Sequence, residues 1–490
     1  MSPHRVDTSS ARPASLPVAC DVAIVGAGPA GIAAATLTAD LGLHALLLDE
    51  QAAPGGEVYR ALATASAARR ATLGPDYEQG AALLVAFERS RAHHVPGASV
   101  CGVASTAAGF ELCVVRDGAA QLLDARCVIL AVGALERPLH IEGGTLPGVT
   151  SAGVAQRQLQ QAAQLPPGPT VLAGCGPLLY SVAQQLSEAG ADVVAILDTL
   201  SAARFVRALP HAVAFIRSPY YARGANLLKD INETVPIYHD VVEIAALGND
   251  KLVSVRFTAN KRTTTLIADQ LVLHQGIVPE IHLADSLGCA MAWDDTAACW
   301  APRVDTWGAS SVAGIFIAGD GAGIAGANAA AHRGALAGLE AATTLGRIDA
   351  RTRDAAAAPH RQRLARSLRG RRFLDTVYRP PERFRLPRGD TIVCPCEDVT
   401  AREVVDAVHE GCTGPNQLKA ILRCGMGPCQ GRDCGLAITE LVARERGLPP
   451  STVGRFRARF PAKPLTLGQL AMLPSSAADR FAVTRQPEDA

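Results

Sequence analysis

Six of the thirteen cysteines fall within 41 residues near the C-terminus, and one of them, Cys412, stands apart from the others and is interpreted as structural. Cys394-Pro-Cys396 is followed after 32 residues by Cys429-x4-Cys434, and Cys424 lies a short distance before this second pair. Most other cysteines of this large chain stand singly in apolar runs, so such crowding favours metal ligation over disulfides. Four thiolates at this spacing can hold a [2Fe–2S] cluster or a zinc ion. We predict Cys394, Cys396, Cys429 and Cys434 as ligands, with Cys424 as an alternative.

A glycine-rich turn near the N-terminus is the second candidate for chemistry. Residues 21–35 read DVAIVGAGPAGIAAA, a short apolar strand, a turn and an Ala-rich helical pattern. In this fingerprint the first glycine permits the tight turn, the second lets the backbone approach a pyrophosphate, and the third lets helix and strand pack closely. The helix N-terminus then offers free N–H groups to the phosphates. The residues expected to contact the nucleotide are Gly26, Gly28, Pro29, Ala30 and Gly31.

Further segments indicate FAD rather than NAD as the ligand of this turn. The next expected strand ends in two acids that can accept hydrogen bonds from ribose hydroxyls, and Asp49 fits the usual spacing better than Glu50. A Pro-Gly-Gly motif follows. Residues 127–134 (CVILAVGA) and 314–323 (GIFIAGDGAG) look like the strands that leave and re-enter an interrupted FAD domain. A helix starting near Gly321 should point its N-terminus at the flavin. The FAD contacts expected here are Asp49, Glu50, Gly55, Gly56, Glu57, Ala131, Gly133, Gly319 and Asp320.

The segment between the two halves of the FAD domain holds a second, incomplete fingerprint. Residues 170–179 (TVLAGCGPLL) supply its first two glycines, but Leu179 stands at the third position. A leucine there should push helix and strand apart or shift the turn, so NAD(P)H is not the expected electron donor. Asp198, at the end of the next expected strand, favours a free ribose over a 2′-phosphate. The residues predicted for this second site are Gly174, Gly176, Pro177, Leu178 and Asp198.

These motifs require an α/β fold with several domains. The predicted class is a two-dinucleotide-binding-domain flavoprotein, a Rossmann-like FAD domain with an inserted second nucleotide domain, followed by a small helical [2Fe–2S] domain. Thr400-x-x-Glu403 is a capping box that predicts a helix through His409, and further helices should begin at Pro415 and after Gly435. The expected divisions are a disordered tail (1–18), the FAD domain (19–155 and 286–346), the inserted domain (156–285), a basic linker (347–388), the cluster domain (389–448) and a C-terminal tail (449–490).

Composition and charge argue against several functions. A formal net charge of +1 over 490 residues disfavours a nucleic-acid partner. The chain lacks an uninterrupted apolar stretch of about 18 residues and an apolar leader, so we expect a cytoplasmic protein without a membrane span, with peripheral association at the inner membrane face left open. Absence of a redox C-x-x-C pair excludes a disulfide reductase. Residues 361–388 carry ten arginines and two acids, and are either a solvated connector or a surface for an acidic partner or electron acceptor.

Together the motifs resemble one known family. Residues 22–60, 133–153, 172–179 and 394–434 look like the α subunits of bacterial opine oxidases, D-hydroxyproline dehydrogenase and heteromeric proline dehydrogenases, and the flavoprotein subunit of hydrogen cyanide synthase is similar. The resemblance implies a BFD-like [2Fe–2S] domain and a β subunit that is related to D-amino-acid oxidases, carries its own flavin and oxidises a C–N bond. It also implies a small iron–sulfur γ subunit in many members, and a downstream quinone or electron carrier. Some members carry ATP in the second nucleotide domain, and relatives commonly have Gln in place of Glu57.

The sequence therefore predicts the FAD-dependent α subunit of a heteromeric dehydrogenase for amino or imino acids of the proline, hydroxyproline or opine class. Coexistence with FAD favours [2Fe–2S] over zinc, because a two-electron flavin needs a one-electron partner to pass electrons on singly. No catalytic base is assigned, and His140 and His274 are interpreted as structural. Two alternatives remain: a self-sufficient NAD(P)H-dependent reductase, and a scaffold subunit with structural nucleotide sites.

Overall fold

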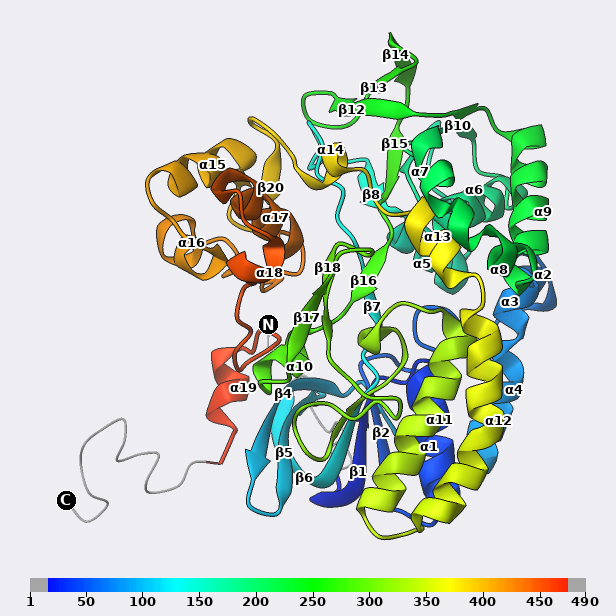
Figure 1. Cartoon of the computed structure of the whole chain (residues 1–490), viewed down its shortest axis with the longest axis vertical. Coiled ribbons are helices and arrows are strands. Elements are labelled where there is room, and N and C mark those ends of the chain that lie inside the picture. The colour runs from blue at the N-terminus through cyan, green and yellow to red at the C-terminus, as the bar shows by residue number, and fades with distance from the viewer. Residues whose placement is uncertain (1–15, 475–490) are drawn as a thin grey trace, which may run out of the picture.

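The computed structural model describes residues 16–474 of the chain. Figure 1 shows the predicted FAD domain at the bottom, the inserted nucleotide domain above it, and a small helical module with the cysteines at one side. Most of the predicted 1–18 tail, and residues 475–490 of the predicted C-terminal tail, lie outside the described residues. Leu16 is buried, and its N–H donates to Oε1 of Gln121 at 3.2 Å. The packed chain thus begins before residue 19.

The FAD domain is built on a seven-stranded sheet in the order β3-β2-β1-β6-β5-β4, with β19 beside the end of β6. The strands β1, β2, β3, β6 and β19 run parallel, whereas β4, β5 and β6 form an antiparallel meander. Phe316 of β19 pairs with Ile129 of β6, which confirms that the segments 127–134 and 314–323 meet in one sheet. The strands are β1 (Ala19–Val25), β2 (Ala45–Asp49), β3 (His93–Pro96), β4 (Ser99–Thr106), β5 (Gly109–Arg116), β6 (Ala119–Leu130) and β19 (Ile315–Ile317).

Helices from both ends of the FAD domain cover this sheet. The first helix, α1, packs closely against α11. A Cβ added at Gly334 would lie only 2.0 Å from the carbonyl oxygen of Ala30, so the contact leaves no room for a side chain there. Outside this pair lies α12, which Figure 1 shows running beside α11. The helices of this region are α1 (Pro29–Asp40), α2 (Ala67–Leu73), α3 (Pro75–Glu78), α4 (Gly80–Arg89), α11 (Ala327–Thr344) and α12 (Ala350–Leu368).

The inserted domain has a parallel five-stranded sheet in the order β11-β10-β9-β15-β8. Because β8 and the following helix belong to it, this domain begins before the predicted residue 156. A short antiparallel pair, β7 and β16, carries the chain in and out. The elements are β7 (Ala134–Glu136), β8 (Val149–Ser151), α5 (Ala152–Ala162), β9 (Thr170–Gly174), α6 (Pro177–Glu188), β10 (Val193–Asp198), α7 (Ala202–Ala208), η1 (Leu209–His211), α8 (Ala212–Ile216), α9 (Pro219–Thr234), β11 (Ile237–Tyr238), β12 (Val241–Leu247), β13 (Ser254–Ala259), β14 (Arg262–Ile267), β15 (Gln270–His274) and β16 (Ile277–Pro279).

The predicted basic linker is helical and its outer face is exposed to solvent. Its residues form α12, α13 and α14, and several of its arginines have partners within the chain. The guanidinium of Arg361 lies 4.1 Å from the ring centre of Trp307, Arg371 donates to Asp375 at 2.8 Å, and Arg385 pairs with Glu440. The helices that complete the linker are α13 (Arg371–Val377) and α14 (Glu382–Arg385). The elements between the inserted domain and β19 or just after it are α10 (His282–Ser286), β17 (Met291–Asp294), β18 (Cys299–Pro302) and η2 (Gly319–Ala322).

The cysteine module has a small hairpin and three helices, and two further short helices follow them. The capping box at Thr400 and Glu403 is confirmed, as are the helix starts at Pro415 and Gly435. Within residues 16–474, no helix is both long and apolar enough to cross a bilayer. The elements are β20 (Ile392–Cys394), β21 (Val399–Thr400), α15 (Ala401–His409), α16 (Pro415–Leu422), α17 (Gly435–Arg446), α18 (Pro450–Val453) and α19 (Leu467–Ala471).

The close packing of α1 on α11 can be tested with two Gly→Ala substitutions. Gly334→Ala should destabilise the chain by about 1–3 kcal/mol, because the added methyl group meets backbone that cannot move aside easily. Gly224→Ala in α9 has no atom within 4 Å of the added carbon, and should stabilise by about 0.5–1 kcal/mol through helix propensity. Urea unfolding followed by circular dichroism measures both. Equal midpoints for the two variants would contradict the proposed packing.

Candidate functional site

The first glycine turn is a cradle that side chains would fill. Gly26 has a φ of +103°, and a Cβ there would lie 2.5 Å from the carbonyl oxygen of Ala131. At Gly31 a Cβ would lie 1.8 Å from the carbonyl oxygen of Gly26. Gly28 is the N-cap of α1, with Pro29 as its first residue and no acid in the first turn. This arrangement leaves the helix N-terminus open to a phosphate, as the fingerprint predicts.

A second loop approaches this turn from the other side. Gly56 has a φ of +61°, and a Cβ there would lie 2.7 Å from Cα of Gly28. The N–H of Gly55 donates to the carbonyl oxygen of Ala27 at 2.8 Å. Glu57 pairs with Arg60, whose side chain is buried, while Glu57 itself is largely exposed. The Pro-Gly-Gly motif therefore lies against the first fingerprint.

The two acids after β2 have different roles. Asp49 is buried, and its carboxylate accepts N–H groups of Ala27 and Gln51 at the glycine turn. Burial raises the pKa of Asp49, although these N–H groups oppose the shift. Glu50 accepts from the hydroxyl of Ser99 at 2.6 Å and pairs with Lys463 of the C-terminal segment. Asp49 is therefore the acid at the predicted nucleotide turn, and Glu50 is engaged elsewhere.

The returning segment differs from the prediction in one respect. No long helix begins near Gly321: a short turn of 3-10 helix, η2, lies there, and α11 begins at Ala327. Gly323 and Gly326 have φ values of +127° and +89°, which interrupt a regular helix. Asp320 holds this loop, because its Oδ1 accepts the N–H groups of Ala325 at 2.8 Å and Gly326 at 3.1 Å.

The predicted contacts in this region still converge on the first glycine turn. A Cβ at Gly319 would lie 2.8 Å from Cβ of Ala30, and one at Gly321 would lie 3.4 Å from the carbonyl oxygen of Gly133. Ala131 donates its N–H to the carbonyl oxygen of Val25 at 2.8 Å. The strand ends from both halves of the domain thus surround one turn.

The second glycine turn is partly filled by the chain itself. A Cβ at Gly176 would lie 3.1 Å from Nε2 of His274, and one at Gly174 would lie 1.7 Å from that residue's carbonyl oxygen. The imidazole is held by Glu136, with Nδ1 and Oε1 2.6 Å apart. Leu179 is fully buried, and α6 nevertheless begins at Pro177, directly after the turn, and continues through Leu178.

The acid of the second site is also occupied by protein groups. Oδ2 of Asp198 accepts the hydroxyl of Tyr180 at 2.8 Å and lies 3.2 Å from Nδ1 of His239, and its Oδ1 accepts the N–H of Leu200 at 2.9 Å. Residue 175, between the two glycines, is a fully buried cysteine that packs with Val377 and Tyr378 of the former linker. A helix of the linker region therefore covers this turn.

Polar groups without partners nevertheless remain beside the second turn. Gln275, which follows β15, is fully buried, and neither amide atom has a partner among the described residues. Nε of Arg379 is also buried and also has no hydrogen-bond partner among the described residues. Burial together with Arg379 and Arg137 lowers the pKa of Arg385 to about 10, and burial and Arg379 lower that of Arg204. These arginines form a concentration of positive charge near residue 175.

Five of the six cysteines of the C-terminal module, all except Cys412, come together. Cys394 is hydrogen-bonded by the thiols of Cys424 and Cys434, which hold its pKa far below the usual range, to about 2, while the pKa of each of those two thiols is raised. Cys396 and Cys429 contact each other and are half-buried. Within residues 16–474, no three His, Cys, Asp or Glu side chains already stand in a metal-binding arrangement. The thiols form hydrogen bonds with one another instead, and Cys424 belongs to the buried set with Cys394 and Cys434.

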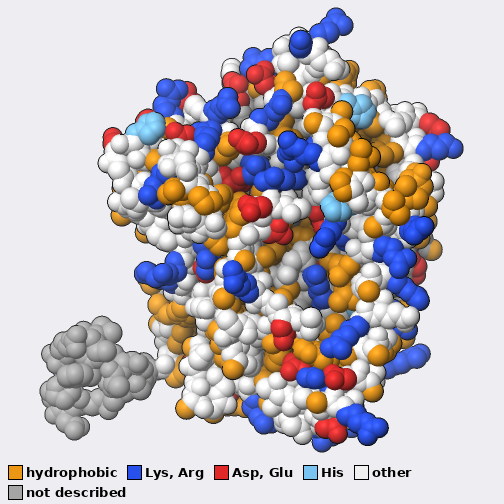
Figure 2. All heavy atoms as spheres, in the orientation of Figure 1, with side chains coloured by type: hydrophobic (Ala, Val, Ile, Leu, Met, Phe, Trp, Pro, Cys, Tyr) orange, Lys and Arg blue, Asp and Glu red, His pale blue; other side chains and the backbone are white. Residues whose placement is uncertain are grey.

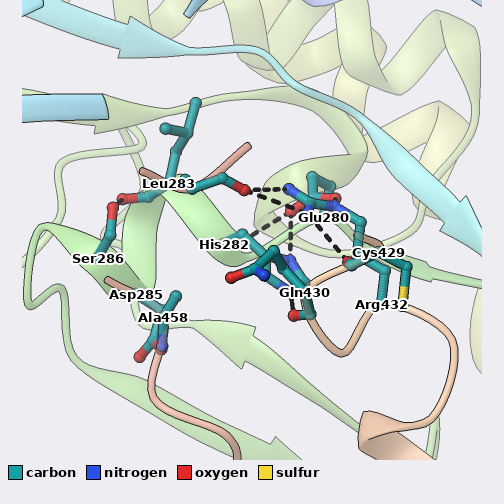
Figure 3. A network of polar contacts seen from close by, with 10 residues as sticks. Glu280, His282, Leu283, Asp285, Ser286, Cys429, Gln430, Arg432 and Ala458 are labelled. Carbon is teal, nitrogen blue, oxygen red and sulfur yellow. Dashed lines mark hydrogen bonds and ion pairs between the residues drawn. The ribbon is translucent and has the colours of Figure 1, made fainter. Parts of the chain in front are cut away.

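A polar network joins the cysteine turn to the FAD domain (Figure 3). Glu280, just after β16, donates its N–H to the carbonyl oxygen of Gly133 at 3.1 Å, and its Oε2 accepts from Nε of Arg432 at 2.9 Å. Arg432 also donates to the carbonyl oxygen of Cys429 at 3.2 Å. Nδ1 of His282 lies 2.6 Å from Glu280, and its Nε2 lies 3.1 Å from the carbonyl oxygen of Gln430.

Residues 455–462 of the predicted C-terminal tail form a strap that holds this junction. Asp285 of α10 pairs with Arg455 and accepts the N–H of Ala458 at 2.8 Å. Further along, Ala462 donates its N–H to the carbonyl oxygen of Cys101 at 2.7 Å and accepts from Arg432 at 3.2 Å. The segment 455–462 therefore ties the cysteine module to the FAD domain.

Sequence reasoning missed Glu280, His282 and Arg432. Arg432 stands inside the motif CGMGPCQGRDCG, and a charged residue between ligand cysteines was an available signal. Glu280 and His282 follow a short strand with no motif around them, so their role depends on contacts made about 150 residues away. His140 is largely buried, its Nε2 lies 3.7 Å from Asp433, and burial lowers its pKa to about 4. It is therefore neutral at pH 7 and forms no ion pair.

Comparisons with known proteins cover nearly the whole chain. Residues 20–337 match the pyridine nucleotide-disulphide oxidoreductase family, and residues 388–473 match the sarcosine oxidase A3 domain. The A subunit of opine oxidase from Agrobacterium tumefaciens (strain Ach5) is 41% identical over 96% of this chain and 95% of its own length. The HcnB subunit of hydrogen cyanide synthase from Pseudomonas aeruginosa is 31% identical over 90% of this chain and 96% of its own.

One solved structure shows a similar fold over both nucleotide domains and beyond. L-proline dehydrogenase from P. horikoshii has a TM-score of 0.68 and 21% sequence identity, and the match covers 92% of this chain and 79% of that one. The second family match runs to residue 473. This agrees with the contacts of the strap, which make the predicted tail part of the cysteine module.

The contribution of the Glu280 ion pairs to the stability of the folded chain should depend on pH. Burial opposes its ionisation, but His282 and Arg432 together lower the pKa of Glu280 from 4.5 to about 2. Because the pKa is lower in the folded chain than in the unfolded one, ionised Glu280 stabilises the folded state by about 3 kcal/mol. This stabilisation is complete above pH ~4.5 and is lost as the pH falls toward 2. Glu280→Gln should therefore be less stable than wild type at pH 7, and this difference should shrink below pH ~4.5.

Thermal or urea unfolding at a series of pH values measures this difference. Glu188→Gln, at an exposed position of α6, is the matched control and should follow the wild-type curve at every pH. A stability difference between Glu280→Gln and wild type that stays constant from pH 7 to 3 would contradict the proposed ion-pair network.

Proposed function

The chain belongs to the pyridine nucleotide-disulphide oxidoreductase family, in the group of the opine oxidase A subunits, and we propose that it carries FAD and a [2Fe–2S] cluster as the electron-transfer subunit of a heteromeric dehydrogenase. The substrate class is an amino or imino acid such as proline, hydroxyproline or an opine. Relatives named as opine oxidase, sarcosine oxidase and hydrogen cyanide synthase subunits support an oxidoreductase acting on such C–N compounds.

One observation carries the proposal most directly. Through its backbone Glu280 holds the exit of the FAD domain at Gly133, and through its carboxylate it holds Arg432 in the cysteine turn. The predicted flavin site and the predicted cluster site are thus tied to one buried residue. A fixed separation of two redox groups is what electron transfer between them requires, whereas a zinc staple would need no such junction.

The residues present fit the two groups. The first glycine turn and its surrounding strand ends would hold FAD, with Asp49 as the acid at the turn. Cys394, Cys396, Cys429 and Cys434 would supply four thiolates to the cluster, and the contact of Cys424 with Cys394 makes it a competing ligand. When bound, FAD would supply a two-electron acceptor, and the cluster would pass electrons on singly.

The second nucleotide domain would hold an adenine nucleotide such as ATP and not a hydride donor. Asp198 is already engaged by Tyr180, and residue 175 is covered by Tyr378. The buried amide of Gln275 and the Nε of Arg379 lack partners among the described residues. Buried polar groups without a hydrogen-bond partner in the protein are expected to bind a ligand or water, and arginine side chains are suited to binding phosphate.

The names of the relatives imply partner subunits, and the kinds of partner are part of the proposal. The opine oxidase and sarcosine oxidase relatives are named as subunits, and so as parts of larger enzymes. We place beside this chain a D-amino-acid-oxidase-like β subunit that oxidises the substrate, a small iron–sulfur γ subunit, and a quinone or electron carrier as acceptor. The proposed setting is the cytoplasm.

Anaerobic rapid mixing tests the direction of electron flow. In the intact complex, substrate should reduce first the flavin and then the cluster of this chain. NADH should leave the flavin of the isolated chain oxidised. Rapid bleaching by NADH would overturn the proposal in favour of a self-sufficient reductase, and turnover without reduction of this chain would favour a scaffold.

Flavin content should respond to the contact between the two glycine loops. Gly56→Ala places a carbon 2.7 Å from Cα of Gly28, whereas Gly97→Ala has a similar φ of +68° and no atom within 4 Å. Both substitutions carry the same backbone strain, so only the first should separate the loops. We expect FAD per chain, measured by absorbance after purification, to fall several-fold in Gly56→Ala alone. Equal flavin contents in the two variants would count against this site.

Iron content tests the ligand set. The purified chain should hold roughly two irons and two acid-labile sulfides. Serine at 394, 396, 429 or 434 should abolish both, and Cys412→Ser should retain them, because Cys412 is buried elsewhere in the module and bonds to Gly414. Zinc in place of iron, or loss of iron in Cys424→Ser with retention in one of the four, would revise the assignment.

A further inference from the structure

Four arginines that are far apart in the sequence come together beside the second glycine turn. We call them the arginine cluster: Arg137 follows β7, Arg204 lies in α7, Arg379 precedes α14, and Arg385 ends α14. Burial and, behind it, the positive charge of Arg379 lower the pKa of each of the other three. Both Arg137 and Arg204 lie near enough to the thiol of Cys175 to oppose the rise in its pKa that burial causes. The cluster therefore adjoins the second glycine turn.

Protein groups neutralise only part of this positive charge. Arg137 is 5% exposed and donates to two backbone carbonyl oxygens at 2.7 and 2.9 Å. Arg204 and Arg385 donate to the same carbonyl oxygen, that of Pro380, at 3.5 and 3.2 Å. Among residues 16–474, the one carboxylate that forms an ion pair with the cluster is Glu440, which pairs with Arg385. Several buried like charges beside a single carboxylate are costly unless an anion joins them.

The other acids of this region are engaged elsewhere or exposed. Asp198, at the end of β10, accepts the hydroxyl of Tyr180 at 2.8 Å and the N–H of Leu200 at 2.9 Å. Glu382, at the start of α14, is exposed to solvent. The helix α6 has no acid in its first turn, so its N-terminus adds to the positive potential beside the turn.

A buried amide without partners lies at the same strand ends. Gln275 is fully buried, and the next residue, Gly276, accepts the N–H of Arg137 at 2.8 Å. Neither amide atom of Gln275 has a hydrogen-bond partner among the described residues, and the same holds for Nε of Arg379. Buried polar groups in folded proteins nearly always have partners. Arginines together with an amide N–H suit a ligand with several acceptor oxygens and negative charge, as a phosphate group has.

The arginine cluster also connects three parts of the chain. Arg204 belongs to the inserted domain, Arg379 belongs to the linker, and Arg385 pairs with Glu440 of α17 in the cysteine module. Figure 1 shows α14 between that module and α7. In Figure 2, Lys and Arg side chains gather on this face between the module and the inserted domain, with some acids beside them. An anion held by the cluster would therefore act on all three parts.

We propose that a phosphate group bound by the arginine cluster and Gln275 fastens the linker, and through it the cysteine module, to the inserted domain. The phosphate belongs to the adenine nucleotide proposed for the second domain, so the inference rests on that part of the proposed function. Bound phosphate reduces the repulsion between the arginines and keeps α14 against α7, with Arg385 on Glu440. Loss of the phosphate loosens the linker. The nucleotide thus controls the position of the cysteine module without donating electrons.

Thermal unfolding and limited proteolysis of the full-length chain test the inference. After bound nucleotide is removed with apyrase and desalting, ATP should raise the unfolding temperature. It should also slow chymotryptic cleavage of the linker several-fold, at Phe373, Tyr378 and Phe384. Chymotrypsin is suitable because arginine substitutions leave its sites unchanged. Inorganic triphosphate and orthophosphate are tested separately: protection by orthophosphate equal to that by ATP would retain the fastening and overturn the nucleotide as its source.

Two variants and a matched control locate the site. Arg379→Gln should bind ATP about ten-fold more weakly in calorimetry, because a charged hydrogen bond to phosphate is lost. Gln275→Leu should weaken ATP binding to a similar degree. Without nucleotide it should be at least as stable as wild type, because an unpaired buried amide is replaced by apolar groups. Arg383→Gln, at an exposed position of α14, should bind ATP and resist chymotrypsin as wild type does.

The possible failures can be told apart. Equal ATP affinities in Arg379→Gln and Arg383→Gln would leave a nucleotide in the second domain and overturn its attachment to the arginine cluster. ATP binding that leaves cleavage of the linker unchanged would overturn the fastening. A chain that binds ATP as expected but is not reduced by substrate in the intact complex would contradict the electron-transfer proposal alone. A chain that is reduced normally and does not bind ATP would contradict only the nucleotide and this inference.

Discussion

The largely buried carboxylate of Glu280 connects the parts of this molecule. It is almost enclosed, and removing a carboxylate from water is costly unless charged partners replace the water. Arg432 and His282 supply that replacement, and both of them also contact the backbone of the cysteine turn. The FAD domain is joined to the same residue through Gly133. The pairing of this carboxylate, together with the strap at 455–462, therefore sets the orientation of the cysteine module.

The two nucleotide domains have the same architecture, but their glycine turns differ in how open they are to a ligand. In the first, glycines leave the turn open, and two further loops close around it. In the second, His274 lies against the turn and a helix of the former linker covers its middle residue. Similar strands and helices thus give one open site and one largely enclosed by the chain's own side chains. The difference lies in the side chains and the linker and not in the sheet, as expected when function is added to a common fold.

The sequence alone determined the features that depend on local backbone requirements. The glycines of the first turn, the capping box at Thr400 and the helix start at Pro415 are short-range constraints, recognisable without knowledge of any distant contact. The cysteine pairs were recognisable for the same reason. Only the tertiary structure decided how Glu280 meets Arg432, that Cys424 lies against Cys394, that Asp198 is occupied by Tyr180, and that the basic linker is helical. Pairings between buried groups far apart in sequence depend on how all the elements pack, and no local pattern encodes them.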